Sequence, residues 1–284
     1  VVKTWVYKAI GESVIGSNGE YADGNIDVSG SNLRVFGGGL FSNGNVIINF
    51  YSGINVDKNI EAVGNININQ SCNVIASSTL SNNFPPAPAP IAMPAISFDN
   101  VGDDESYKNR ADAIYTKKQF EDLLWANRGG SLTLNGIHYV TGDVSIKGDI
   151  NLTINGALVS DGNIVLGENT LLCCWGLNCG RADIVINQQS STSPSGIFSK
   201  KDINFELCLD TLDAKGLFYA NDKINILSLT RTNSIQGALV SRKLTLTSLW
   251  QGFNITYDNN IVNQALGNPQ FSPIVTVEHW EEEY

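Results

Sequence analysis

The sequence is poor in charged residues, and it lacks any clustering of basic ones. Charged side chains make up 16% of its 284 residues, well below the roughly 25% of an average domain. Lys and Arg number 18 against 28 Asp and Glu, which gives a net charge of −10. Such a surface repels phosphate backbones, and no Lys/Arg cluster opposes this repulsion. The composition therefore argues against nucleic acid and anionic membranes as partners.

Long apolar runs are also missing. No stretch approaches the roughly 18 apolar residues that a membrane span needs. The chain begins VVKTWVYK, without Met and without a signal peptide. We interpret it as an excised fragment or a mature ectodomain whose anchor lies outside this sequence, and so expect an extracellular, cell-surface location.

Groups typical of catalytic sites are scarce. The two histidines, His138 and His279, have no Ser or Cys nucleophile pattern beside them. The acidic trio at 103–105 stands where a helix is expected to begin, so capping accounts for it better than glycoside hydrolysis. Arg231, Arg242 and Lys243 lack the acidic companions of a calcium-dependent lyase. The sequence predicts no catalytic residues, no metal ligands and no cofactor.

Glycine is abundant, with 27 residues, and it belongs to a repeat. Gly24-Asn25-Ile26 returns as Gly44-Asn45-Val46 and as Gly64-Asn65-Ile66. The apolar residue after each such turn opens a short alternating strand and recurs about every 20 residues, at Ile26, Val46, Ile66, Val144, Ile164, Ile184, Ile203, Ile224 and Leu244. A unit this short buries its apolar face only by stacking on its neighbours. The sequence therefore predicts an all-β parallel β-helix, or solenoid, of about 20-residue coils.

A second strand precedes each of these positions by about eight residues and begins with Gly. Alternation along it predicts an outward apolar stripe made of Tyr21, Phe41, Glu61, His138, Leu158, Asn178, Phe198, Phe218 and Leu239. An exposed apolar stripe on a solenoid needs a covering element or a partner.

The repeat stops between residues 77 and 130. FPPAPAPIAMP at 84–94 is too rich in Pro to join a sheet. Helices are predicted at 104–114 and after Thr116, which forms a capping box with Gln119. We expect one continuous domain, with coils at 1–76, an insertion at 77–130, and coils plus a cap at 131–284. The insertion either covers the stripe or leaves part of it open as a contact surface.

The five cysteines include a cluster at Cys173, Cys174 and Cys179. A disulfide, for example between Cys174 and Cys179, and buried free thiols both fit this spacing. The pairing stays open.

Aromatic residues are the remaining candidates for a binding site. Sugars present flat C–H faces that pack on aromatic rings without needing charge. Trp175, Trp250 and Tyr257 fall in loops or near the last coils, where exposure is expected. The predicted carbohydrate-binding residues are Tyr21, Phe41, Trp175, Phe198, Phe218, Trp250 and Tyr257.

Four segments carry a family resemblance: FSNGNVIINF, YVTGDVSIKGDINLTING, GALVSDGNIVL and FNITYD. They resemble ectodomains of bacterial pilus-associated proteins, and their arrangement is similar to the C-terminal domains of tāpirins, surface proteins of cellulolytic thermophilic bacteria. The resemblance implies a β-helical, cell-surface protein, associated with type IV pili, that binds cellulose without cleaving it. No sugar-contact motif of that family maps onto this chain.

The first hypothesis is a non-catalytic adhesin, monomeric in solution, that binds an insoluble neutral plant polysaccharide, with cellulose as the first candidate. The second is a structural minor pilus component or a polymer-forming solenoid. The Trp-bearing C-terminal segment predicts a capped end, which argues against open polymerisation. A polysaccharide lyase or hydrolase is the third.

Overall fold

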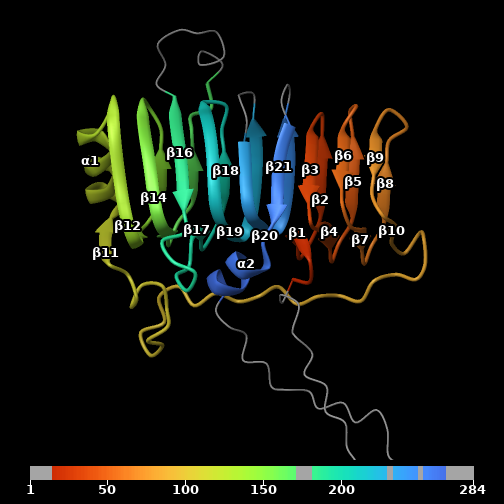
Figure 1. Ribbon diagram of the computed structural model, residues 1–284, viewed down its shortest axis with the longest axis horizontal. Helices are drawn as coiled ribbons and strands as arrows, with labels where there is room; N and C mark the ends of the chain where they lie inside the picture. The colour runs from red at the N-terminus through yellow and green to blue at the C-terminus, as the bar shows by residue number, and fades with distance from the viewer. Residues whose placement is uncertain (1–14, 171–180, 229–232, 249–251, 267–284) are drawn as a thin grey trace, which may run out of the picture.

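The chain forms the parallel β-helix that the repeat predicts (Figure 1). The computed structural model describes residues 15–170, 181–228, 233–248 and 252–266. Each coil contributes a strand to each of three long sheets, which we name the marker face, the open face and the covered face.

The marker face carries the apolar positions of the repeat. It consists of the C-terminal parts of β19 (Leu209–Ser228) and β20 (Asn233–Ser248), together with β2 (Ile26–Ser29), β5 (Val46–Asn49), β8 (Ile66–Ile68), β13 (Val144–Ile146), β15 (Ile164–Leu166) and β18 (Ile203–Phe205). Eight of the nine predicted positions lie in this ladder and are buried. Ile184 does not, because Ile164 pairs directly with Ile203 and the intervening coil is longer than the rest.

The open face follows the marker face along each coil. It consists of the N-terminal parts of β12 (Gly130–Thr141), β14 (Ile150–Ser160), β19 and β20, together with β3 (Asn32–Phe36), β6 (Gly53–Val56), β9 (Asn73–Ile75), β16 (Ala182–Asn187) and β21 (Gly252–Tyr257). Ile184 belongs here, paired with Leu152 and Leu212.

The covered face completes the coil. It consists of the second halves of β12 and β14 and the middle of β19 and β20, together with β1 (Asn18–Ala22), β4 (Gly39–Ser42), β7 (Ile60–Ala62), β10 (Thr79–Leu80), β11 (Ala113–Thr116) and β17 (Gly196–Ser199). A column of aliphatic side chains from all three faces fills the interior.

The coils do not stack in sequence order. The first coil pairs with the last, with Tyr21 opposite Val240 on the covered face and Leu33 opposite Phe253 on the open face. The coil that ends in β21 therefore lies in the middle of the rod, between β20 and β3. The sequence predicts instead that the C-terminal segment caps an end, and this prediction is wrong for the described coils. The β8–β9–β10 coil forms one end of the rod, and β11 and β12 lie at the other (Figure 1).

Residues 81–112, here named the crossing segment, run along the rod between these two ends (Figure 1). The Tyr21 hydroxyl donates to the Ile91 carbonyl at 2.7 Å, and that of Tyr219 donates to the Pro94 carbonyl at 2.8 Å. The prediction that the insertion covers the apolar stripe is confirmed for this part of the rod, because these rings are buried beneath it.

The residues that form the apolar stripe are not all those that the sequence predicts. His138, Leu158, Phe218 and Leu239 point inward, because Leu239 pairs with Glu20 and not with Tyr21. A one-residue shift of register moves every side chain of a strand to the other face. The outward residues of the C-terminal coils are Tyr139, Val159, Phe198, Tyr219 and Val240.

One of the two predicted helices of the insertion forms. Thr116 and Gln119 make the capping box of α1 (Lys117–Ala126), and Phe120 and Leu124 bury their side chains at the end of the rod. Helix α1 therefore caps this end and does not cover the stripe. Residues 104–112 form turns, so the prediction of a helix at 104–114 is wrong. The second helix that the structure describes is α2 (Asn259–Ala265), whose Ala265 carbonyl accepts a hydrogen bond from Tyr107.

Close stacking depends on glycine where the open face turns into the covered face. A Cβ on Gly196 would lie 1.9 Å from the carbonyl oxygen of Leu217, and the φ of Gly196 is +132°. We expect Gly196→Ala to prevent folding or to lower the free energy of unfolding by more than about 4 kcal/mol. Thermal unfolding measures this, with Gly102→Ala as the control, since a Cβ there meets its nearest atom at 3.7 Å. An unchanged melting temperature in Gly196→Ala would contradict the predicted backbone clash.

Glu20 is a carboxyl group inside the apolar interior. It pairs in register with Leu40 and Leu239, and its two oxygens have no hydrogen-bond partner in the described part of the chain. Burial raises the pKa of Glu20 from 4.5 to about 8. The folded state therefore keeps a proton that the unfolded state releases above pH 4.5.

The free energy of unfolding should consequently fall by about 1.4 kcal/mol per pH unit between pH 4.5 and pH 8, and level off above. Denaturant titrations at pH 5, 6.5 and 8 measure the slope. Glu20→Leu, which continues the leucine column, should remove this contribution and raise stability at pH 8. An identical slope in this variant would assign the pH dependence to other groups.

Candidate functional site

Four of the predicted sugar-binding residues are unavailable to a ligand. Tyr21, Phe41 and Phe198 face outward but lie beneath the crossing segment and its neighbours, and Phe218 points into the core. None of the four is more than 1% exposed. Because a sugar needs an exposed ring face, the prediction for these residues is wrong.

The other three have different positions. Tyr257 is half-buried, and its hydroxyl donates to the carbonyl of Gly16 at 2.8 Å, which ties β21 to the start of β1. Trp175 and Trp250 lie outside the residues that the structure describes.

Cys173, Cys174 and Cys179 also lie outside the described residues. Cys208 is disulfide-bonded, and Cys72 is free.

Candidate catalytic groups stay scattered across the described residues. The acidic trio belongs to a turn, in which the Asp103 carboxylate accepts from the backbone N–H of Glu105 at 3.0 Å. His138 stacks on Tyr115, and burial lowers the pKa of its imidazole. No group of three or more His, Cys, Asp or Glu side chains suited to a metal ion occurs in the described ranges.

The open face presents regular columns of mostly neutral polar side chains. Its central column consists of Thr133, Thr153, Val185, Asp213, Ser234, Asn254, Arg34, Asn55 and Ile75, one from each successive coil. In a neighbouring column, Asn155 donates to the amide oxygen of Asn135 at 2.8 Å, and Asn187 donates to that of Asn155 at 3.0 Å. The face therefore repeats at the strand spacing of about 4.8 Å.

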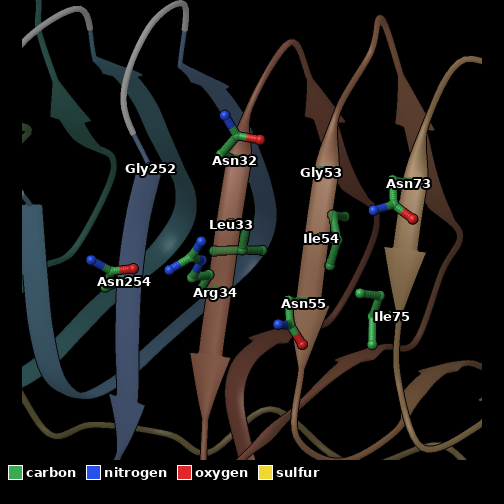
Figure 2. Close-up of a pocket in the computed structure, with 10 residues that line it drawn as sticks. All are labelled: Asn32, Leu33, Arg34, Gly53, Ile54, Asn55, Asn73, Ile75, Gly252 and Asn254. Carbon is green, nitrogen blue, oxygen red and sulfur yellow. The ribbon is translucent and has the colours of Figure 1, made fainter.

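A hollow of about 540 Å³ opens in this face over β21, β3, β6 and β9, and we name it the amide hollow (Figure 2). Gly53 and Gly252 contribute no side chains to it, and a Cβ on Gly53 would lie 2.6 Å from the Asn32 amide oxygen. The side chains that surround it are Asn32, Leu33, Arg34, Ile54, Asn55, Asn73, Ile75 and Asn254. An amide both donates and accepts hydrogen bonds, as a ligand hydroxyl does.

Arg34 supplies the single charge among these lining residues. Figure 2 shows its guanidinium extending toward Asn254 on β21. A guanidinium donates hydrogen bonds and cannot accept them. The hollow thus combines four amides with one fixed donor group, an arrangement that can bind hydroxyl groups but contains no acid–base pair.

Phe50 and Tyr51 form the turn directly before β6, and we name this pair the aromatic corner. Their side chains are 71% and 84% exposed, and both residues have positive φ, at 51° and 55°. Tyr51 N–H donates to the Ser71 hydroxyl at 3.3 Å, which links the corner to the turn before β9. Only Ser52 separates Tyr51 from Gly53 of the hollow, so the exposed rings and the amides belong to one region.

Positive φ is unfavourable for residues with a Cβ, and aromatic residues are poorly suited to it. The preceding coil places Gly30, with φ of 58°, at the equivalent turn. Sequence reasoning missed the aromatic corner, although a signal was present: two aromatic residues stand where neighbouring coils have Gly30 and Gln70-Ser71.

Comparisons with known proteins identify no family. No protein-family model matches the chain, and no curated protein matches it. One solved structure that matches is the crystal structure of an ice binding protein from an Antarctic Biological Consortium. It is 13% identical over 93% of this chain and 98% of that chain, with a TM-score of 0.34. A likeness at this level supports no functional inference. No helix among the described residues is long and apolar enough to cross a membrane.

The aromatic corner should be a source of strain. Phe50→Asn with Tyr51→Gly introduces the Asn-Gly pair that two successive positive φ angles favour. We expect this double variant to raise the free energy of unfolding by about 1 kcal/mol, because the strain exceeds the entropy cost of the added glycine. Denaturant unfolding measures the change. Phe84→Asn, at an exposed ring without positive φ, should give no such gain, and a double variant less stable than the wild type would contradict the strain.

Proposed function

We propose that this protein is a non-catalytic adhesin that binds an insoluble neutral polysaccharide, with cellulose as the first candidate, through the amide hollow and the aromatic corner. The observation that carries the proposal is the exposed Phe50–Tyr51 pair, held at positive φ beside a hollow lined by amides. Strained backbone that presents two apolar rings to solvent is costly for folding and is explained by a contact that the rings make.

The chemistry of this region fits a neutral sugar polymer. Ring faces accept the C–H faces of sugars, and the amides of Asn32, Asn55 and Asn73 match hydroxyl groups. The open face continues beyond the hollow with the same coil-to-coil period, so an extended chain meets similar groups along it. A polymer without charge is also compatible with a protein of net charge −10.

A cell-surface location remains part of the proposal. The disulfide at Cys208 supports it, because such bonds persist in oxidising environments outside the cytoplasm. We expect the protein to act as a monomer at the cell surface.

One observation favours the second candidate, a structural pilus component or polymer-forming solenoid. The end coil at β8–β10 exposes Ile68 and Ile75, and Phe84 at the start of the crossing segment is exposed beside Ile68. No charged residue occurs between Glu61 and Asp99. Native sheet edges are usually protected by charge. Sedimentation analysis at increasing concentration tests this candidate, since end-to-end contacts would give assemblies larger than a monomer.

Depletion from solution by microcrystalline cellulose, xylan and pectin tests the adhesin proposal. Wild-type protein should be depleted by cellulose, equally at low and high salt, and should release no sugar. Phe50→Asn with Tyr51→Gly should weaken this binding about tenfold or more while the protein stays folded.

Phe84→Asn is the matched control, because it removes an exposed ring outside the amide hollow. It should bind cellulose as the wild type does. Wild-type protein that stays in solution with every polymer would refute the adhesin proposal, and released sugar would favour the enzyme. If the double variant bound cellulose as tightly as the wild type, the aromatic corner would not be part of the binding site.

A further inference from the structure

A second cleft, of about 420 Å³, lies where α1 packs beside β13. Helix α1 is at the end of the rod opposite the β8–β10 coil (Figure 1). We name it the α1 cleft. Trp125, which is 70% exposed, lines it together with Lys117 and Arg128 from the helix side and Ser145 and Lys147 from the marker face. Two carboxylates, Glu121 and Glu168, complete its polar groups. Its volume falls within the range of small-ligand sites.

The cations of this cleft are distant in sequence, and the fold brings them together. Lys117 pairs with Asp143 at 3.6 Å, whereas Arg128 and Lys147 have no ion pair within the described ranges. The guanidinium of Arg128 packs against Gly148, so that a Cβ there would meet its Nε at 3.3 Å. Two cationic side chains without an ion pair, beside an exposed indole, are unusual on a protein of net charge −10 and indicate a site for a negatively charged group.

Backbone contacts position the aromatic and basic groups relative to each other. The Arg128 N–H donates to the Trp125 carbonyl at 3.2 Å in the turn that ends α1. Phe120 and Leu124 of the same helix are buried in the end of the core, and Leu124 also lines the cleft. Trp125 and Arg128 are therefore held by a packed helix and do not belong to a free loop.

We propose that the α1 cleft binds an acidic sugar, a uronate carried on an oligosaccharide. A carboxylate pairs with Arg128 and Lys147, since Arg binds carboxylates with two parallel hydrogen bonds. The sugar ring packs on the indole of Trp125, and Glu121 and Glu168 accept hydrogen bonds from its hydroxyls. The two glutamates disfavour a small, fully charged anion such as phosphate, and a neutral sugar leaves the cations without a partner.

This site is independent of the amide hollow and differs from it in ligand charge. The hollow has one cation among its lining residues and lies over β21, β3, β6 and β9, whereas the α1 cleft lies at the other end of the rod. Binding at the α1 cleft should weaken with salt, because exposed charge pairs are screened.

Isothermal titration calorimetry tests the proposal, with tetragalacturonate, cellotetraose and inorganic phosphate as separate probes. Tetragalacturonate should bind the wild type, more weakly at 500 mM than at 50 mM salt, and the other two probes should bind at least about tenfold more weakly. Trp125→Ala and Arg128→Gln with Lys147→Gln should each lower the affinity about tenfold or more.

Lys118→Gln is the matched control, because Lys118 lies on the same helix, does not line the cleft and pairs with Asp122 at 3.0 Å. It should bind tetragalacturonate with wild-type affinity. Circular dichroism and thermal unfolding must show that each variant is folded. No binding of tetragalacturonate by the wild type, equal binding of phosphate, cellotetraose binding that both cleft variants weaken as strongly, or full affinity for tetragalacturonate in both cleft variants would each overturn the proposal.

Discussion

The parallel pairing of the first coil with the last is the contact on which the rest of the molecule depends. A single coil cannot bury its apolar face, so each coil is stable only between neighbours. By placing β1, β2 and β3 on β20 and β21, the chain joins two separate stacks of coils into one core. The middle of the sequence consequently forms both ends of the rod, and the crossing segment must span the distance between them.

That geometry determines which surfaces a ligand can reach. The crossing segment covers the apolar stripe, and the hydroxyls of Tyr21 and Tyr219 donate hydrogen bonds to its backbone carbonyls. The open face is left accessible, with the amide hollow and the aromatic corner close to the junction of the two stacks. Capping by α1 seals one end of the core and at the same time presents Trp125 beside Arg128. The positions of both candidate sites thus follow from the pairing of the first coil with the last and from the capping of one end by α1.

The sequence predicts the β-helix and α1 because both depend on local patterns, namely the 20-residue period, the alternation along strands and the capping box at Thr116. It does not predict the order of the coils, because every coil has a similar apolar face and the period is compatible with several stackings. The sequence also does not predict that Phe198 and Tyr21 are buried, because the residues that cover them are far away in the chain. Phe218 is buried because a one-residue shift of register turns its side chain into the core. Of the candidate site, only the aromatic pair at Phe50 and Tyr51 left a signal in the sequence, and this signal was missed.

The amide hollow and the aromatic corner are the proposed binding site for a neutral polysaccharide. Hydrogen exchange with mass spectrometry, performed on the protein free and adsorbed on cellulose, tests it most directly. We expect slower exchange in peptides that cover residues 49–56 and 71–75 and in β21, with no change in the crossing segment or α1. Protection confined to the crossing segment, to α1 or to the end coil at β10, or no protection on adsorbed protein, would contradict it.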